Sequence, residues 1–386
     1  MKIQKLSYSE FEGQPGEWIF EDCTFGTVNL IVGKNATGKT RTLNVIRGLA
    51  AQLSESPFLQ VSEGSYVVHF DKDGVSYDYI CEYHDRRVIA EELKIDGDKR
   101  MWRGPDGVGS VHAVKLGGEL DFQTEFYRLA AVAKRDSIQH PFLDDLYQWA
   151  QGVTRLDFGT ALGQDHLAIK VNEQTDRTSE AKLNIKDTEK IVPLFLQAER
   201  EFPDKFKIDV ISDMNYIGYD IEDIGVDSIA GMSLVTAGGL EALITGRPTG
   251  TYIKETDLPT RTIQPSISQG MFRAFSLFIQ INYGLLSNKS TCILIDDIGE
   301  GLDFERSSSI VKRLIEKTKG SPIQLLMTTN DRFIMNAVPL DYWIILVRKG
   351  GRVRNLNYRN SKEMFERFYD TGLNNFDLFS SGYYKE

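Results

Sequence analysis

A short glycine-rich segment near the N-terminus has residue types and an order suited to phosphate binding. Its residues are Gly33, Lys34, Asn35, Ala36, Thr37, Gly38, Lys39 and Thr40, in the pattern G-x-x-x-x-G-K-[ST]. Glycines let backbone N–H groups face phosphate oxygens, the lysine ammonium reaches the β- and γ-phosphates, and the threonine hydroxyl is a ligand for Mg²⁺. We therefore predict that this segment and the next residue, Arg41, bind ATP, with Thr40 on the metal ion.

The elements around this segment fit that chemistry. The apolar run at residues 27–32 predicts a strand that leads into the glycines, and residues 42–47 predict a helix that follows them. A helix that starts directly after the loop points its positive end at a bound phosphate.

An acidic pair late in the chain follows a second apolar run. Residues 292–295 are all apolar, as expected of a central parallel strand, and Asp296 and Asp297 come next. Because ligands collect at the carboxyl ends of parallel strands, we predict that Asp296 holds Mg²⁺. Asp297 is then placed to orient the water that attacks the γ-phosphate.

A serine-containing segment lies shortly before that strand. Ser268 and Gly270 belong to the sequence Ser-Ile-Ser-Gln-Gly at residues 266–270, and the apolar residues that follow have helical spacing. The serines stand where helix N-caps are favoured, and a helix start is a second anion site.

With these pieces in this order, the chain resembles the ABC-type ATPases of the RecF, SMC, Rad50 and OLD group. Residues 267–270 look like the L-S-x-G signature of that group, and Asn35 fits the form of its phosphate loop better than the form usual in transporter subunits. The resemblance implies an α/β fold, an ABC ATPase head with a P-loop core and a β lobe, which here carries a mixed helical insertion. It also implies a head-to-tail homodimer around two nucleotides, with Ser268 and Gly270 on the partner's γ-phosphate.

Two positions depart from the pattern of that group. Asp297 stands where the group usually carries a glutamate, so hydrolysis is expected to be slow or differently arranged. Asn330 stands where many members have a switch histidine, and an amide can bond a γ-phosphate but cannot carry a proton. The glutamine that senses Mg²⁺ and water in that group corresponds to Gln139 or to Gln123, and the alternative for either residue is a solvated glutamine in a loop.

Hydrophobic patterning predicts three segments. Residues 1–136 hold the phosphate loop and antiparallel hairpins at 65–112, residues 137–260 form the inserted lid, and residues 261–386 complete the head. Within the lid we expect helices at 143–153 and 191–202 and strands at 208–211 and 251–254. Beyond it we expect a helix at 304–317 and strands at 323–329 and 342–347.

Composition narrows the function classes. A formal net charge of −10 opposes broad attraction to nucleic acid, and no apolar run is long enough to span a membrane, so a cytoplasmic protein without a membrane partner is expected. The three cysteines and five histidines are scattered, which indicates neither a disulfide framework nor a metal cluster.

Two interpretations of function follow. In the first, the chain is an ATP-driven switch that controls a separate effector protein such as a nuclease, as the resemblance to stand-alone OLD-like ATPases of anti-phage defence implies. In the second, it is a RecF-like ATPase that binds DNA directly, and the basic stretch at residues 348–359 is either that DNA contact or a solvated hairpin. The phenylalanine-rich tail at 364–379 is expected to pack against the head.

Overall fold

The computed structural model describes residues 1–54, 62–170, 187–229, 247–289 and 291–385, and the chain forms two compact units. The first unit comprises Met1–Val153, Ser290–Asp296 and Lys317–Glu386, and the second comprises Thr154–Lys289 and Asp297–Glu316. The second unit therefore begins later than residue 137 and takes in residues on both sides of the strand that ends at Asp296. Of the expected insertion, residues 171–186 and 230–246 lie outside the described part of the chain.

Parallel strands form the centre of the first unit. Strand β3 (Val28–Val32) pairs in parallel with β16 (Gln324–Thr328) on one edge and with β17 (Trp343–Lys349) on the other. Strand β15 (Cys292–Asp296) pairs in parallel with β16. Every residue of β3, β15 and β16 is buried, which is typical of a parallel sheet covered on both faces.

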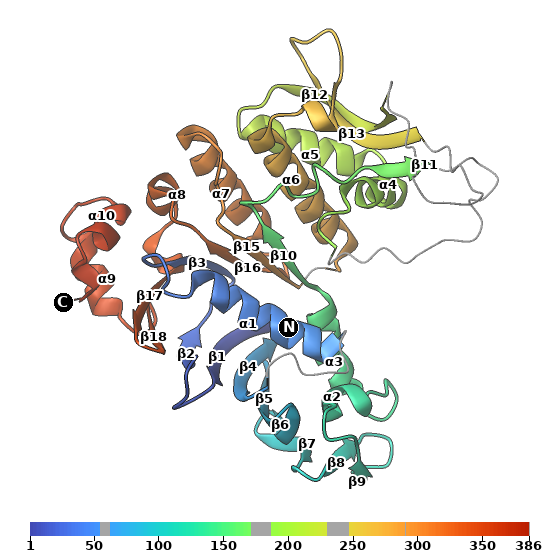
Figure 1. Cartoon of the computed structure of the whole chain (residues 1–386), viewed down its shortest axis with the longest axis vertical. Coiled ribbons are helices and arrows are strands. Elements are labelled where there is room, and N and C mark those ends of the chain that lie inside the picture. Colours follow the sequence, from blue (N-terminus) through green and yellow to red (C-terminus); the bar gives the residue numbers. More distant parts are fainter. Residues whose placement is uncertain (55–61, 171–186, 230–246, 290, 386) are drawn as a thin grey trace. The chain divides into compact units, whose positions relative to one another are not determined.

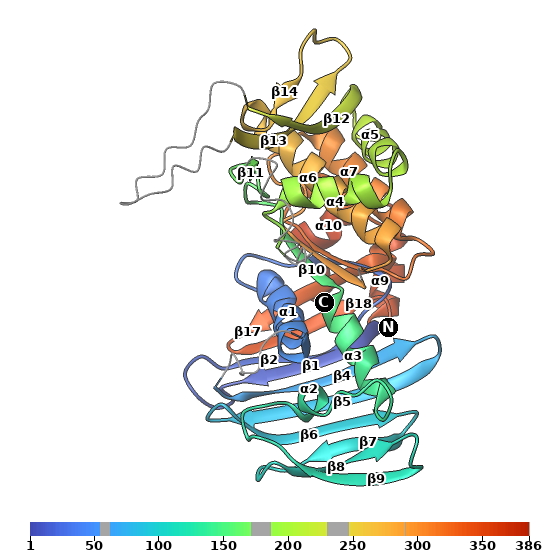
Figure 2. The ribbon, with the colours of Figure 1, turned by 90° about the vertical axis from the view of Figure 1, so that its right-hand side faces the viewer.

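The same sheet continues from β17 into the antiparallel lobe (Figure 2). Beyond β17 the order is β18 (Arg352–Asn357), β2 (Trp18–Thr24), β1 (Lys2–Glu10), β4 (Gly64–Lys72), β5 (Val75–His84), β6 (Arg87–Ile95), β7 (Asp98–Arg103), β8 (Val108–Ala113) and β9 (Gly118–Gln123). Asp73 with Gly74, and Asp96 with Gly97, have positive φ angles, as the turns of two-residue hairpins require. The predicted hairpins are confirmed.

Helices α1 (Lys39–Ser54), α2 (Ala130–Ala133) and α3 (Pro141–Gln151) cover one face of this sheet (Figure 2). Trp149 of α3 meets Phe70 of β4 edge to face, with ring centroids 4.8 Å apart. The start of α2 has no side-chain cap of its own, but the buried carboxylate of Glu91 accepts hydrogen bonds from the backbone N–H groups of Ala130 and Ala131. Burial of Glu91 raises its pKa, while these hydrogen bonds act in the opposite direction.

The C-terminal tail forms α9 (Lys362–Tyr369) and α10 (Asn375–Ser380), next to α8 (Arg332–Ala337) (Figure 1). Phe365, Phe368 and Leu378 are buried, and Asn375 donates a hydrogen bond to the carbonyl of Val338, 2.8 Å away. The expected packing of the tail is therefore confirmed for these residues.

The second unit combines helices with a small antiparallel sheet (Figure 1). Its helices are α4 (Ile191–Glu201), α5 (Lys205–Tyr216), α6 (Gln269–Ser287) and α7 (Phe304–Thr318). Its strands are β11 (Ala168–Lys170), β12 (Ile221–Ser228), β13 (Arg247–Glu255) and β14 (Thr262–Ile263), while β10 (Val153–Asp157) begins in the first unit.

One predicted strand in this unit is wrong. Residues 208–211 lie within helix α5, because Phe206, Val210 and Met214 recur every four residues and bury one helical face. The carboxylate of Asp213 on the same helix is fully buried and accepts hydrogen bonds from Asn282 of α6 and Arg313 of α7, each at 2.7 Å. This polar cluster joins three helices.

Among the described residues, no helix combines the length and apolar character needed to cross a membrane.

Candidate functional site

The glycine-rich loop, residues 33–40, connects the buried strand β3 to helix α1. A Cβ atom on Gly33 would lie 2.4 Å from Thr37 Oγ1 and 3.2 Å from the carbonyl oxygen of Leu346, so only glycine fits there. Ala36 and Gly38 have φ angles of 63° and 105°, which turn the chain sharply before the helix. The loop therefore curls back on itself, and the Thr37 hydroxyl closes it by donating to the carbonyl of Lys34 at 2.8 Å.

Lys39 places its ammonium group inside this curl. The residue is only 8% exposed, and Nζ donates a hydrogen bond to the carbonyl oxygen of Gly33 at 2.9 Å. The first turn of α1 carries no acidic side chain, so nothing on that turn neutralises the positive end of the helix. A buried ammonium, a glycine-only cradle and an uncompensated helix start suit a phosphate group.

Asp296 stands at the carboxyl end of β15, beside the loop. Its Oδ1 atom accepts a hydrogen bond from the hydroxyl of Thr40 at 3.2 Å and one from the hydroxyl of Thr328 at 2.5 Å. Asp296 is 6% exposed. Hard oxygen atoms from a carboxylate and a hydroxyl, together with phosphate oxygens, are what Mg²⁺ prefers, so Thr40 and Asp296 fit that ion.

Thr328 is a site residue that sequence reasoning missed. It ends β16, and the register of the sheet pairs it with Ile31 of β3. Its only sequence signal is that it lies at the end of an apolar strand, two residues before Asn330.

Trp18 and Arg41 support the loop from β2 and α1. The indole of Trp18 is fully buried. A Cβ atom on Gly38 would lie 3.3 Å from Cζ2 of this indole, so the ring packs directly against the backbone of Gly38. The guanidinium of Arg41 packs over the same ring at 4.8 Å and forms an ion pair with Glu10. Burial lowers the pKa of Arg41, and the nearby charge of Arg348 lowers it further. Nothing in the sequence linked Trp18 to the glycine-rich loop.

Arg348 reaches the loop from the end of β17. Its Nη1 atom donates to the carbonyl oxygen of Ala36 at 3.1 Å, and its Nε atom donates to that of Gly350 at 2.8 Å. The sequence placed this residue in a basic stretch without linking it to the loop. The pairing of β17 with β3 is what brings the two together.

Asn330 and Gln139, two predicted site residues of the first unit, lie at different ends of it. Asn330 is exposed and follows β16 at the same edge as the loop, and the next residue, Asp331, caps α8. Gln139 lies instead beside the end of β8, where its carbonyl accepts a hydrogen bond from Val114, and Gln123 ends β9. With neighbouring strands about 4.8 Å apart, both glutamines lie on the order of 40 Å from β3 along the sheet. The assignment of Gln139 to the nucleotide, and the alternative of Gln123, are therefore corrected.

The other predicted site residues belong to the second unit. Ser268 is the N-cap of α6, with φ −60° and ψ 145°, and it is exposed with no capping hydrogen bond from its side chain. A Cβ on Gly270 would lie 2.7 Å from the carbonyl oxygen of Gly301, so the first turn of α6 and the turn at 299–303 are in backbone contact. Asp297 has a φ angle of 50°, a left-handed conformation that aspartate and asparagine tolerate better than most residues.

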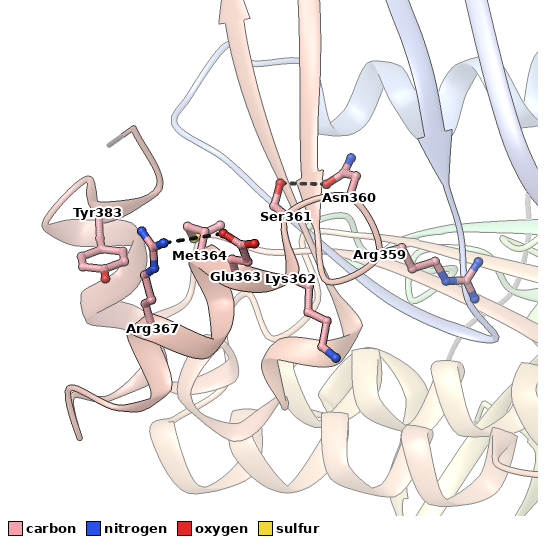
Figure 3. Close-up of a pocket in the computed structure, with 8 residues that line it drawn as sticks. All are labelled: Arg359, Asn360, Ser361, Lys362, Glu363, Met364, Arg367 and Tyr383. Atoms are coloured by element: carbon pink, nitrogen blue, oxygen red, sulfur yellow. Dashed lines mark hydrogen bonds and ion pairs between the residues drawn. The ribbon is translucent and has the colours of Figure 1, made fainter.

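A separate pocket of about 570 Å³ lies at the start of α9 (Figure 3). Arg359, Lys362 and Arg367 give its lining a mostly basic character. Lys362 forms an ion pair with Glu366, and Arg367 forms one with Glu363, so two of these cations are already partly neutralised.

Among the described residues, no group of three or more histidine, cysteine, aspartate or glutamate side chains is arranged to hold a metal ion.

The chain was compared with protein families, curated proteins and solved structures. No protein-family model and no curated protein matches the sequence. A solved structure of an SMC head bound to the C-terminal winged-helix domain of ScpA aligns with 94% of this chain and 100% of its own, at a TM-score of 0.51 and 13% identity.

Two further solved structures give lower scores. An SMC head domain from Thermotoga maritima aligns with 92% of this chain and 99% of its own, with a TM-score of 0.45 and 13% identity. An SMC head with an extended coiled coil, bound to the C-terminal domain of ScpA and derived from Pyrococcus furiosus, aligns with 95% and 99%, with a TM-score of 0.48 and 11% identity.

The predicted fold class is confirmed: the chain is an α/β protein with a large mixed sheet, and its fold is similar to that of an SMC head domain. At 13% identity the likeness concerns the fold, and the chemistry is argued from the residues of this chain.

Proposed function

We propose that the chain binds Mg-ATP at residues 33–41 and hydrolyses it. The observation that carries this proposal is the buried ammonium of Lys39 inside the loop, beside a carboxylate that already accepts two threonine hydroxyls. Thr40 and Asp296 would hold Mg²⁺, which, when bound, neutralises phosphate charge and orients the reacting phosphoryl group. Asp297 orients the attacking water, and Asn330 contacts the γ-phosphate through its amide.

The second part of the proposal is closure of two copies around two nucleotides. Ser268 is exposed at the start of α6, a helix whose first turn has no acidic residue. Such a helix start favours an anion. Ser268 and Gly270 would therefore contact the γ-phosphate of the nucleotide that the second copy holds. The resemblance of residues 267–270 to the L-S-x-G signature supports the same arrangement.

The third part is control of a separate effector protein, such as a nuclease, in a bacterial anti-phage defence module. ATP-dependent closure changes which surfaces are exposed, and an effector that binds the open and closed states differently would respond to it. The support is the resemblance to stand-alone OLD-like ATPases.

A second candidate function is direct DNA binding in the manner of RecF-type ATPases. It is favoured by one observation, which is the exposure of Arg352 and Arg354 on β18 close in sequence to the basic pocket at α9. Arg352 is however paired with Glu21 at 3.1 Å, and the chain as a whole is acidic. These charges oppose a phosphate backbone, so we place this function second.

Replacement of Lys39 tests the site itself. Lys39→Ala removes the ammonium that compensates phosphate charge, so ATP affinity should fall at least about 100-fold, which is about 2.8 kcal/mol. Isothermal titration calorimetry measures this change. Lys99→Ala, which alters an exposed lysine of the β lobe, should bind as the unaltered protein does. Unchanged affinity in Lys39→Ala would refute the site.

Asp297→Asn tests the role of the carboxylate. Asparagine tolerates the left-handed backbone at this position, so the variant removes the charge with little strain. Hydrolysis should slow at least about tenfold, or about 1.4 kcal/mol of transition-state stabilisation, while ATP affinity stays within about threefold. Asp331→Asn is the matched control, because asparagine also caps helices. Normal turnover in Asp297→Asn would place the base elsewhere.

Ser268→Arg tests closure. The exposed N-cap accommodates a large side chain in the single copy, whereas Gly270→Asp would also collide with Gly301. We expect unchanged ATP binding by the monomer and loss of the ATP-dependent dimer in analytical ultracentrifugation. Thr260→Arg, at another exposed site of the same unit, should dimerise normally. Dimerisation of Ser268→Arg would contradict the arrangement.

Co-purification tests effector control. The lone chain with ATP and Mg²⁺ should not cleave DNA or RNA, and cleavage should appear only when it is purified with proteins encoded beside it. In the same assays, DNA should leave the ATPase rate of the lone chain within about twofold. Cleavage by the lone chain would contradict the division of labour, and strong stimulation by DNA would favour the RecF-like function.

A further inference from the structure

Arg273 joins three segments of the second unit through one buried guanidinium. The residue is 6% exposed and lies in the first turns of α6. Its Nε atom donates to the carbonyl oxygen of Thr160 at 2.7 Å, and its Nη2 atom donates to that of Gly159 at 2.9 Å. Its Nη1 atom donates to the carbonyl oxygen of Glu300, also at 2.9 Å.

Local helix stability does not account for an arginine at this place. A charged group taken out of water carries a desolvation penalty. Every residue of α6 from Met271 to Gly284 is buried, so the helix is enclosed on all sides and an apolar side chain at position 273 would suit the packing. What arginine adds is a rigid planar fork of donors that fixes several backbone groups at once.

The backbone also packs closely around the guanidinium group of Arg273. A Cβ on Gly301, whose φ is +81°, would lie 2.5 Å from Nη1 of Arg273, and a Cβ on Gly270 would lie 2.7 Å from the carbonyl of Gly301. A Cβ on Gly159 would lie 2.6 Å from the carboxylate of Glu300. The start of α6, the loop at 159–160 and the turn at 299–303 are thus interlocked with little room to slide.

This interlock adjoins Asp297. The backbone N–H of Glu300 donates to the carbonyl of Asp297 at 3.2 Å, so the carbonyl that Arg273 holds belongs to the same tight turn as that aspartate. The other end of the interlock is the first turn of α6, which begins one residue after Ser268.

We propose that Arg273 is a positioning residue that makes Asp297 and the start of α6 move as one body. This inference rests on the proposed function, in which Asp297 serves the nucleotide of its own chain and Ser268 serves that of the second copy. Arg273 touches neither nucleotide. It ties closure to hydrolysis, because a shift of the turn that holds Asp297 also shifts the helix start that meets the partner's nucleotide.

The test compares Arg273→Gln and Arg273→Lys with Arg313→Gln. Arg313 is a suitable control because it also holds a buried polar group of this unit, the Asp213 carboxylate, away from the site. For Arg273→Gln we expect ATP affinity of the monomer within about twofold, kcat reduced at least about tenfold, and a weakened ATP-dependent dimer. Arg273→Lys keeps the charge but loses the fork, so its kcat should lie between those of Arg273→Gln and the unaltered protein.

Stability is measured in parallel by thermal unfolding. Arg313→Gln should lower Tm about as much as Arg273→Gln does, yet keep kcat and dimerisation within about twofold. Normal kcat and dimerisation in Arg273→Gln would overturn the proposal, as would an equal loss of kcat in Arg313→Gln at equal Tm. If Arg273→Gln does not fold, Arg273→Lys with full kcat overturns it. Failure of the unaltered protein to bind ATP would instead refute the proposed function.

Discussion

The parallel pairing of β3 with both β16 and β17 is the constraint on which the rest of the site depends. It fixes the point at which the chain leaves the sheet and enters the glycine-rich loop. The same pairing sets Thr328 beside Ile31 and lets Asp296, at the end of the next strand, reach the hydroxyl of Thr40. Buried apolar strands on both sides leave the backbone of β3 little freedom, so the loop starts from a rigid base.

Three cations around the loop, Lys39, Arg348 and Arg41, already have partners within the protein. Lys39 donates to Gly33, Arg348 donates to Ala36, and Arg41 pairs with Glu10. A polyphosphate that enters therefore exchanges partners with these groups. Because backbone carbonyls are weaker partners than a charged phosphate, such an exchange favours the ligand for Lys39 and Arg348. Arg41 would have to leave a carboxylate, which makes it the least available of the three.

The sequence predicted those features whose cause is local. Turn residues with positive φ and alternating apolar residues marked the hairpins, and the loop was visible because glycine, lysine and threonine are each required there. It could not predict Thr328, Trp18 or Arg348, because these residues become neighbours of the loop only through strand pairing. Gln139 was wrong for a related reason: a glutamine before a helix carries no information on which end of a long sheet it occupies. Residues 208–211 are too short a window to show helical spacing. The spacing of four residues appears only over the longer segment from Phe206 to Met214.

The long sheet also has an outer edge at β9. Among the described strands β9 pairs only with β8, so its other side presents backbone groups that a strand from another molecule could bind. Glu119 and Asp121 are exposed on this strand, together with the apolar Leu120. Two like charges on so short an edge oppose its pairing with the same edge of another molecule. Colloidal stability of the protein thus depends in part on carboxylates far from the glycine-rich loop.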